Sequence, residues 1–107
     1  MNELIAKTFD FGIRIVELAS YLEEEKKRFP LIVRLLECGT GIGINLRIAK
    51  ETVKNQIENY KLAYKQSLET EYMLELLVKT GFINEKQSIP ILKDCRLIRD
   101  EIRRLIS

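Results

Sequence analysis

Residues 38–50 read CGTGIGINLRIAK, and this stretch separates two very different kinds of protein. Three glycines at alternate positions, Gly39, Gly41 and Gly43, look at first like a loop that cradles phosphate. Such a loop follows a strand, opens a helix and has the spacing G-x-G-x-x-G or G-x-x-x-x-G-K-[ST]. Neither spacing is present here, and residues 31–38 already keep a helical pattern. The stretch therefore predicts a helix rather than a nucleotide site.

The helical pattern continues on both sides of the glycines. Its apolar face, repeating at about 100° per residue, consists of Leu35, Cys38, Gly39, Ile42, Leu46 and Ala49. Three glycines inside a helix cost about 3 kcal/mol relative to alanine unless close packing offsets the loss. Gly39 and Gly43 are therefore expected to form a shallow groove for another helix. A kink or break at Gly41 is the alternative.

Three further amphipathic helices are expected. They run from Asn2 to Lys27, from about Lys54 to Thr80, and from about Glu85 to Ile106. Pro30 suits the first turn of the glycine-containing helix after a turn near residue 29, and Gly81 suits the position just past a helix end. Pro90 indicates that the last helix begins at Ser88 or Ile89. Short connections and the lack of strand signals predict one all-α domain over residues 1–107, an antiparallel up-down four-helix bundle.

Composition narrows the functions to consider. The chain has 107 residues, 46% of them hydrophobic and 32% charged, and no histidine. Because histidine is the commonest general base and metal ligand, we expect neither an enzyme nor a metal or cofactor site. Cys38 and Cys95 lie on apolar faces and are expected in the core as free thiols. The start has no signal-peptide pattern and no run is long enough to span a membrane, so a cytoplasmic protein is expected.

Two helices carry apolar residues on more than one side. Ile44 and Ile48 project away from the face that holds Leu35 and Leu46, and residues 72–78 are apolar nearly all round. A helix with two apolar sides needs two partners, so we expect a homo-oligomer. The expected interface residues are Ile44, Ile48, Met73, Leu76 and Leu77. Deeper burial within one bundle is the alternative.

In the first helix, apolar residues form two adjoining stripes. One holds Phe11, Ile15, Leu18 and Leu22, and the other holds Phe9, Ile13 and Val16. Together they predict a helix with a broad apolar face.

Basic residues gather on the last helix. The candidate nucleic-acid contacts are Lys93, Arg96, Arg99, Arg103 and Arg104. The first four fall within an arc of about 120° at the helical period, and arginine suits phosphate. Asp100 lies within the same arc, so a solvated helix face is the alternative.

Glu71 and Glu75 are four residues apart on one helix, so their carboxylates could act as a pair. Without histidine or a recognisable cleft partner, they are expected to form ion pairs with lysines instead of catalysing a reaction. The lysines considered are Lys61, Lys65 and Lys79.

Several motifs resemble a known family over nearly the whole chain. They are Asn2-Glu3-Leu4, Phe9-Asp10-Phe11, Arg14-Ile15, Gly39-Thr40-Gly41-Ile42-Gly43-Ile44-Asn45, Glu69–Leu77 and Gly81-Phe82. In order and spacing they resemble the proteins encoded in intervening sequences of 23S ribosomal RNA. The resemblance implies a four-helix bundle that assembles into a homopentameric ring without known enzymatic activity. A related branch, the accessory variability proteins of diversity-generating retroelements, forms a basic pentamer that binds a reverse transcriptase and nucleic acid.

This sequence departs from the family pattern at four positions. Gly41 replaces a usual serine, Ile48 and Gln66 replace usual glutamates, and Met73 replaces a usual tryptophan. A polar cluster shared by relatives is therefore expected to be weakened here. Asn45 is retained and is expected to hydrogen-bond between helices, because a buried amide is costly without a partner.

The leading hypothesis is a non-enzymatic, oligomeric binding module. Its expected partners are other copies of itself and either nucleic acid, RNA or DNA, or a nucleoprotein such as a reverse transcriptase complex. A purely structural or protein-interaction scaffold is the alternative. Salt dependence separates the two, because phosphate contacts weaken steeply as salt rises.

Overall fold

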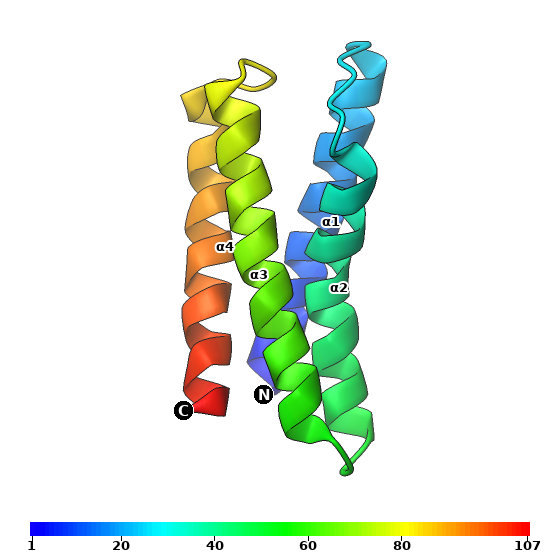
Figure 1. Ribbon diagram of the computed structural model, residues 1–107, viewed down its shortest axis with the longest axis vertical. Coiled ribbons are helices and arrows are strands. Elements are labelled where there is room, and N and C mark those ends of the chain that lie inside the picture. Colours follow the sequence, from blue (N-terminus) through cyan, green and yellow to red (C-terminus); the bar gives the residue numbers. More distant parts are fainter.

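The computed structural model describes residues 1–107 and contains four helices and no strand (Figure 1). The helices are α1 (Asn2–Glu24), α2 (Ile32–Glu51), α3 (Gln56–Lys79) and α4 (Glu85–Ile106). Each helix runs antiparallel to the one before it, and α4 returns beside α1, where the packing is least extensive. The particle measures 43 × 20 × 19 Å. The all-α, four-helix architecture expected from the sequence is confirmed.

Helix ends follow local backbone conformations. Lys26 has a φ of 56°, so α1 ends at Glu24. The sequence had predicted an end at Lys27. Asn55 has a φ of 65° and delays the start of α3 to Gln56. Asparagine tolerates this left-handed conformation better than most residues. Gly81 adopts a φ of 83° just past α3, as the sequence predicted.

The expected start of α4 at about Glu85 is confirmed, and the later start at Ser88 or Ile89 that Pro90 indicated is wrong. The helix begins at Glu85 because a capping box forms ahead of Pro90. The Asn84 side chain accepts a hydrogen bond from the Gln87 backbone N–H at 2.8 Å, and the Gln87 side chain accepts one from the Asn84 N–H at 2.9 Å. These bonds satisfy two backbone donors at the helix start. Pro90, in the second turn, removes one backbone hydrogen bond and leaves the helix continuous.

The glycines of α2 let its neighbours approach closely, and the helix is unbroken across them. A Cβ on Gly39 would lie 2.8 Å from the Ile15 side chain of α1. A Cβ on Gly43 would lie 3.4 Å from the backbone oxygen of Thr8. The predicted helix groove is therefore filled by α1 of the same chain, and the alternative of a break at Gly41 is wrong.

Gly41 faces α3 instead of α1. A Cβ there would lie 2.3 Å from Gln66 Nε2, so the missing side chain leaves room for that amide. Asn45 Nδ2 donates to Gln66 Oε1 at 2.8 Å and to the Gly41 carbonyl at 3.0 Å. The expected hydrogen bond of Asn45 between helices is confirmed, and two amides form it.

The core runs the length of the bundle. Its fully buried large apolar side chains are Phe11, Ile15, Leu22, Leu35, Ile42, Leu46, Leu74, Leu77 and Ile102. Cys38 and Cys95 are buried free cysteines, as expected. Burial raises the pKa of Cys95 to about 12, so its thiol stays protonated and acts as a small apolar side chain.

Candidate functional site

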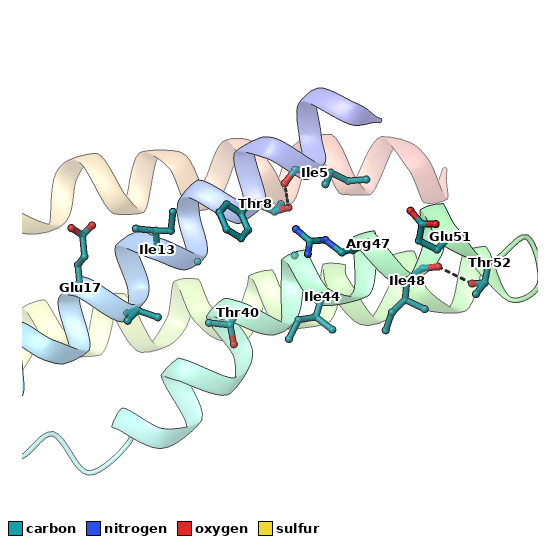
Figure 2. Close-up of a pocket in the computed structure, with 14 residues that line it drawn as sticks. Ile5, Thr8, Ile13, Glu17, Thr40, Ile44, Arg47, Ile48, Glu51 and Thr52 are labelled. Atoms are coloured by element: carbon teal, nitrogen blue, oxygen red, sulfur yellow. Dashed lines mark hydrogen bonds between the residues drawn. The ribbon is translucent and has the colours of Figure 1, made fainter.

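An open apolar groove of about 630 Å³ lies along the outer side of the α1/α2 pair (Figure 2). Phe9, Ile13 and Val16 line it from α1 and are 55, 46 and 48% exposed. Ile44 and Ile48 line it from α2 and are 56 and 42% exposed. Five large apolar side chains thus share one surface that no helix of the chain covers.

The spacing of residues explains how these side chains come together. On α2, Ile44 and Ile48 are one turn apart and point away from the core face. On α1, Phe9, Ile13 and Val16 occupy successive turns on one side. The close approach of the two helices at Gly43 brings the two rows side by side, and so they form one groove.

Few charges border the groove, and none of them takes part in an ion pair. The Arg47 guanidinium lies 5.6 Å from the centre of the Phe9 ring, a cation–π contact. Glu17 and Glu51 lie toward opposite ends (Figure 2). Neither glutamate nor Arg47 takes part in an ion pair.

The structure divides the interface residues expected from the sequence. Ile44 and Ile48 lie on the open groove, whereas Met73 and Leu77 are only 3 and 0% exposed. Leu76 is half-buried. Met73 and Leu77 belong to the buried core of their own chain because α3 turns that side inward, and they leave no surface for a second copy.

Sequence reasoning missed the α1 side of the groove. Phe9, Ile13 and Val16 adjoin the buried stripe of α1, so they were counted as part of one broad inward face. That interpretation was wrong, because α1 is covered on two sides only, by α2 and α4. The sequence did carry a signal for their exposure, because the three residues lie beside the core stripe of α1 and not within it.

The seam between α3 and α4 is lined by ion pairs. The Glu71 carboxylate accepts hydrogen bonds from Arg96 Nε at 2.6 Å and Arg99 Nη1 at 2.5 Å. Asp100 accepts from Arg99 at 3.1 Å and from Arg103 at 3.3 Å. Three of the five residues expected to contact nucleic acid are therefore already bound to carboxylates of their own chain.

Glu71 is the centre of this network. Burial by itself raises the pKa of its carboxyl, but the hydrogen bonds from Arg96 and Arg99 outweigh burial and hold the pKa below the ordinary value. The side chain of Glu71 is 12% exposed, so it depends on its two arginines for solvation.

The expectation that Glu71 and Glu75 form ion pairs with lysines was wrong. Glu71 binds Arg96 and Arg99, and Glu75 lies 3.8 Å from Arg96. The three lysines named from the sequence, Lys61, Lys65 and Lys79, are exposed and unpaired. They lie on the outer side of α3, whereas Glu71 points toward α4.

Three basic residues of α4 have no ion-pair partner. Lys93 and Arg104, both named from the sequence, are exposed and unpaired, and Lys86 is the third. Intervals of seven and eleven residues place all three within about 20° around the helix. We call this row, Lys86, Lys93 and Arg104, the free basic row.

Other polar groups serve the packing of the bundle. Glu69 accepts from Arg34 at 2.8 Å and from the Cys38 thiol at 3.6 Å. Burial raises the pKa of Cys38, so the thiol remains protonated.

No set of three or more His, Cys, Asp or Glu side chains is placed to hold a metal ion. None of the four helices combines the length and the apolar character needed to cross a membrane.

Comparisons with known proteins agree with the fold. The model of the family described as 23S rRNA-intervening sequence protein matches residues 2–104. A crystal structure from Bacteroides thetaiotaomicron, described as a protein of unknown function from the S23 ribosomal protein family, is similar at 34% sequence identity. The similarity has a TM-score of 0.92 and covers 97% of this chain and 98% of that chain. No curated protein matches.

Proposed function

The chain belongs to the 23S rRNA-intervening sequence protein family, as its motifs indicated, and from that premise we propose that it is a homo-oligomeric helical scaffold. The scaffold assembles through the outer face of α1 and α2. A pentameric ring is the form that the family resemblance implies.

The observation that carries this proposal is the apolar groove. Soluble monomers rarely expose contiguous apolar patches larger than a few hundred Å², and larger patches mark surfaces that bind another molecule. Here Phe9 and Ile44 both line the groove and are more than half exposed. Covering apolar surface contributes roughly 25 cal/mol for each Å² removed from water, so a second protein surface on this face is stabilising.

Replacing Ile44 and Ile48 together by lysine tests the proposal. Both side chains are exposed in the single chain, so helicity measured by circular dichroism should be unchanged. The mass measured by light scattering should fall toward that of one chain, because two charges would have to be buried on assembly.

The control changes Ile89 and Leu97 to lysine. These α4 residues are 62 and 52% exposed, so the same chemical change is made at similar exposure on another surface. The control should keep the mass of the unmodified protein. If replacing Ile44 and Ile48 by lysine leaves the mass unchanged, the α1/α2 face is not the assembly surface.

A second function, binding of RNA or DNA or of a nucleoprotein such as a reverse transcriptase complex, is favoured by the free basic row. Lys86, Lys93 and Arg104 are exposed, unpaired and aligned on α4. Repetition of this row around an oligomer would build a positive surface for phosphate. Arg96, Arg99 and Arg103 contribute less, because Glu71 and Asp100 already bind them.

Fluorescently labelled single-stranded RNA and DNA test this second function. Affinity for either strand should fall steeply between low and moderate salt. Changing all three residues of the free basic row to glutamate should abolish binding, while the same change at Lys26, Arg28 and Lys54, exposed at the ends of the bundle, should not. Absence of binding at low salt would leave the scaffold without a nucleic-acid role.

A further inference from the structure

The outer sides of α2 and α3 carry stripes with matching spacing. On α2, intervals of seven, four and three residues join Glu37, Ile44, Ile48 and Glu51. On α3, read from its C-terminal end, the same intervals of seven, four and three join Lys79, Tyr72, Leu68 and Lys65. We call the first the acidic stripe and the second the basic stripe.

Each stripe is a straight row of surface residues. At the helical period, the four positions of either stripe fall within an arc of about 60°. Ile44 and Ile48 are 56 and 42% exposed, and Tyr72 and Leu68 are 65 and 41% exposed. All four charged members are exposed as well.

The charges at the ends of the stripes take part in no ion pair of the chain. The hydrogen bond from Arg34 lowers the pKa of Glu69, and Lys65 lies near enough to that carboxyl only to help lower it. The ion pairs of the chain join other residues, and neither glutamate of the acidic stripe nor lysine of the basic stripe is among them. Each stripe therefore presents two unpaired charges of one sign around two apolar side chains. The two stripes differ in the sign of that charge.

We propose that the basic stripe of a second copy of this chain lies antiparallel on the acidic stripe. Because the intervals match in reverse order, a single register pairs every member: Ile44 with Tyr72, Ile48 with Leu68, Glu37 with Lys79, and Glu51 with Lys65. The inference rests on the proposed scaffold function and names the surface that fills its groove. Phe9, Ile13 and Val16 of α1 border the docked helix.

Charge selects this pairing over a symmetric one. If two acidic stripes met antiparallel about Ile44, Glu37 would lie opposite Glu51 of the second copy. If two basic stripes met about Tyr72, Lys65 would lie opposite Lys79. Like charges placed opposite each other are destabilising, whereas the mixed pairing joins unlike charges at both ends.

The mixed pairing uses different surfaces on the two copies. A dimer formed in this way keeps one unused basic stripe on one copy and one unused acidic stripe on the other, so further copies can add in the same way. A head-to-tail contact of this type produces a closed ring when the rotation closes, and an open filament when it does not. The scaffold therefore grows beyond a dimer.

Charge reversal tests the register. Glu37→Lys with Glu51→Lys, or Lys65→Glu with Lys79→Glu, turns both end pairs repulsive and should weaken assembly by about tenfold or more. The chain that carries all four substitutions restores unlike pairs and should recover the mass of the unmodified protein. Reversing Glu23 and Glu24 of α1, which lie outside both stripes, is the matched control.

Mixing gives a measurement that does not depend on the folding of the fourfold variant. In a mixture of the two double variants, each lysine stripe of one meets a glutamate stripe of the other. The mixture should therefore assemble where each component alone does not, as alternating open chains or even-membered rings, because an odd-membered ring such as a pentamer would place two like stripes together at one contact. Light scattering at low salt measures each sample, and circular dichroism confirms that each variant is folded.

The outcomes separate this inference from the proposed function. Double variants that assemble like the unmodified protein, or a mixture that fails to assemble from folded components, would overturn the register. If lysine at Ile44 and Ile48 still disrupts the oligomer in that case, the α1/α2 face remains the assembly surface. An unmodified protein that stays a single chain at high concentration would overturn both.

Discussion

The groove between α1 and α2 and the seam between α3 and α4 differ in the side chains that line them. Between α3 and α4, Glu71 binds Arg96 and Arg99, and Asp100 binds Arg103. Along α1 and α2, large apolar side chains line an open groove, and Glu17 and Glu51 beside it have no ion-pair partner.

The difference shows where one chain is complete and where it is not. The carboxylates and arginines of the α3/α4 seam satisfy one another, so that seam needs no further molecule. The α1/α2 face gains from a second protein surface, because its apolar side chains are in water and its charges are unpaired. A surface rich in arginine can thus be structural.

The largest expected effect is on the free energy of unfolding, when an inward-facing and an outward-facing isoleucine of α2 are each replaced. Ile42 is fully buried and Ile44 is 56% exposed on the same helix. Ile42→Ala should lower the free energy of unfolding by about 2–5 kcal/mol, because it leaves a cavity. Ile44→Ala should change it by less than about 0.5 kcal/mol. Urea unfolding at a concentration where the protein is a single chain measures both, and equal losses would contradict an open α1/α2 face.

A smaller effect tests the closed α3/α4 seam. Glu71→Gln removes the charge that solvates Arg96 and Arg99, and should lower the free energy of unfolding by about 1–2 kcal/mol. Glu17→Gln makes the same change beside the groove, where no partner is lost, and should stay within about 0.5 kcal/mol. If the two variants are equally stable in urea, the ion pairs of the seam do not stabilise the chain.

The pH dependence sharpens the same contrast. The pKa of Glu71 is lowered in the folded chain from its ordinary value of 4.5. Its contribution is therefore complete above pH 4.5 and is lost as pH falls through the lowered folded pKa. Unfolding curves between pH 7 and about pH 3 should show the difference between unmodified protein and Glu71→Gln shrinking only below that ordinary value. A difference that stays constant through this range would exclude the ionised Glu71 as its source.

The smallest effect compares two glycines of the α1/α2 pair. A Cβ on Gly12 would meet no atom within 4 Å, so Gly12→Ala should raise the free energy of unfolding by about 0.5–1 kcal/mol through helix propensity. Gly39→Ala should lower it, because the new Cβ would lie 2.8 Å from buried Ile15. Thermal unfolding of the two variants measures the opposite signs. A stabilising Gly39→Ala would mean that the α1/α2 contact is loose inside as well as outside.

The sequence predicted some contacts of the site and missed others for a consistent reason. The interhelical bond of Asn45 was predicted, because a buried amide must find a partner wherever the neighbouring helix lies. The pairing of Glu71 was not, because lysines on α3 and arginines on α4 are both partners of opposite charge that the sequence offers. Choosing between them requires the direction in which Glu71 points.

The direction in which a side chain points also explains which apolar residues were predicted correctly. Ile44 and Ile48 were placed outward correctly, because they lie opposite a long, clear core face on α2. Met73 and Leu77 belong to a segment that is apolar nearly all round, so the sequence left their direction open, and the fold turned them inward.

The amino-acid sequence by itself determined four helices, a helical pattern across the glycines of α2, the glycine stop after α3 and the lack of a nucleotide loop. These follow from periodicity and backbone preference, which act within a few residues along the chain. Only the tertiary structure decided which side of each helix meets another helix and which is left to water. Periodicity fixes the angles between side chains around one helix, but the inward direction depends on where the other three helices lie.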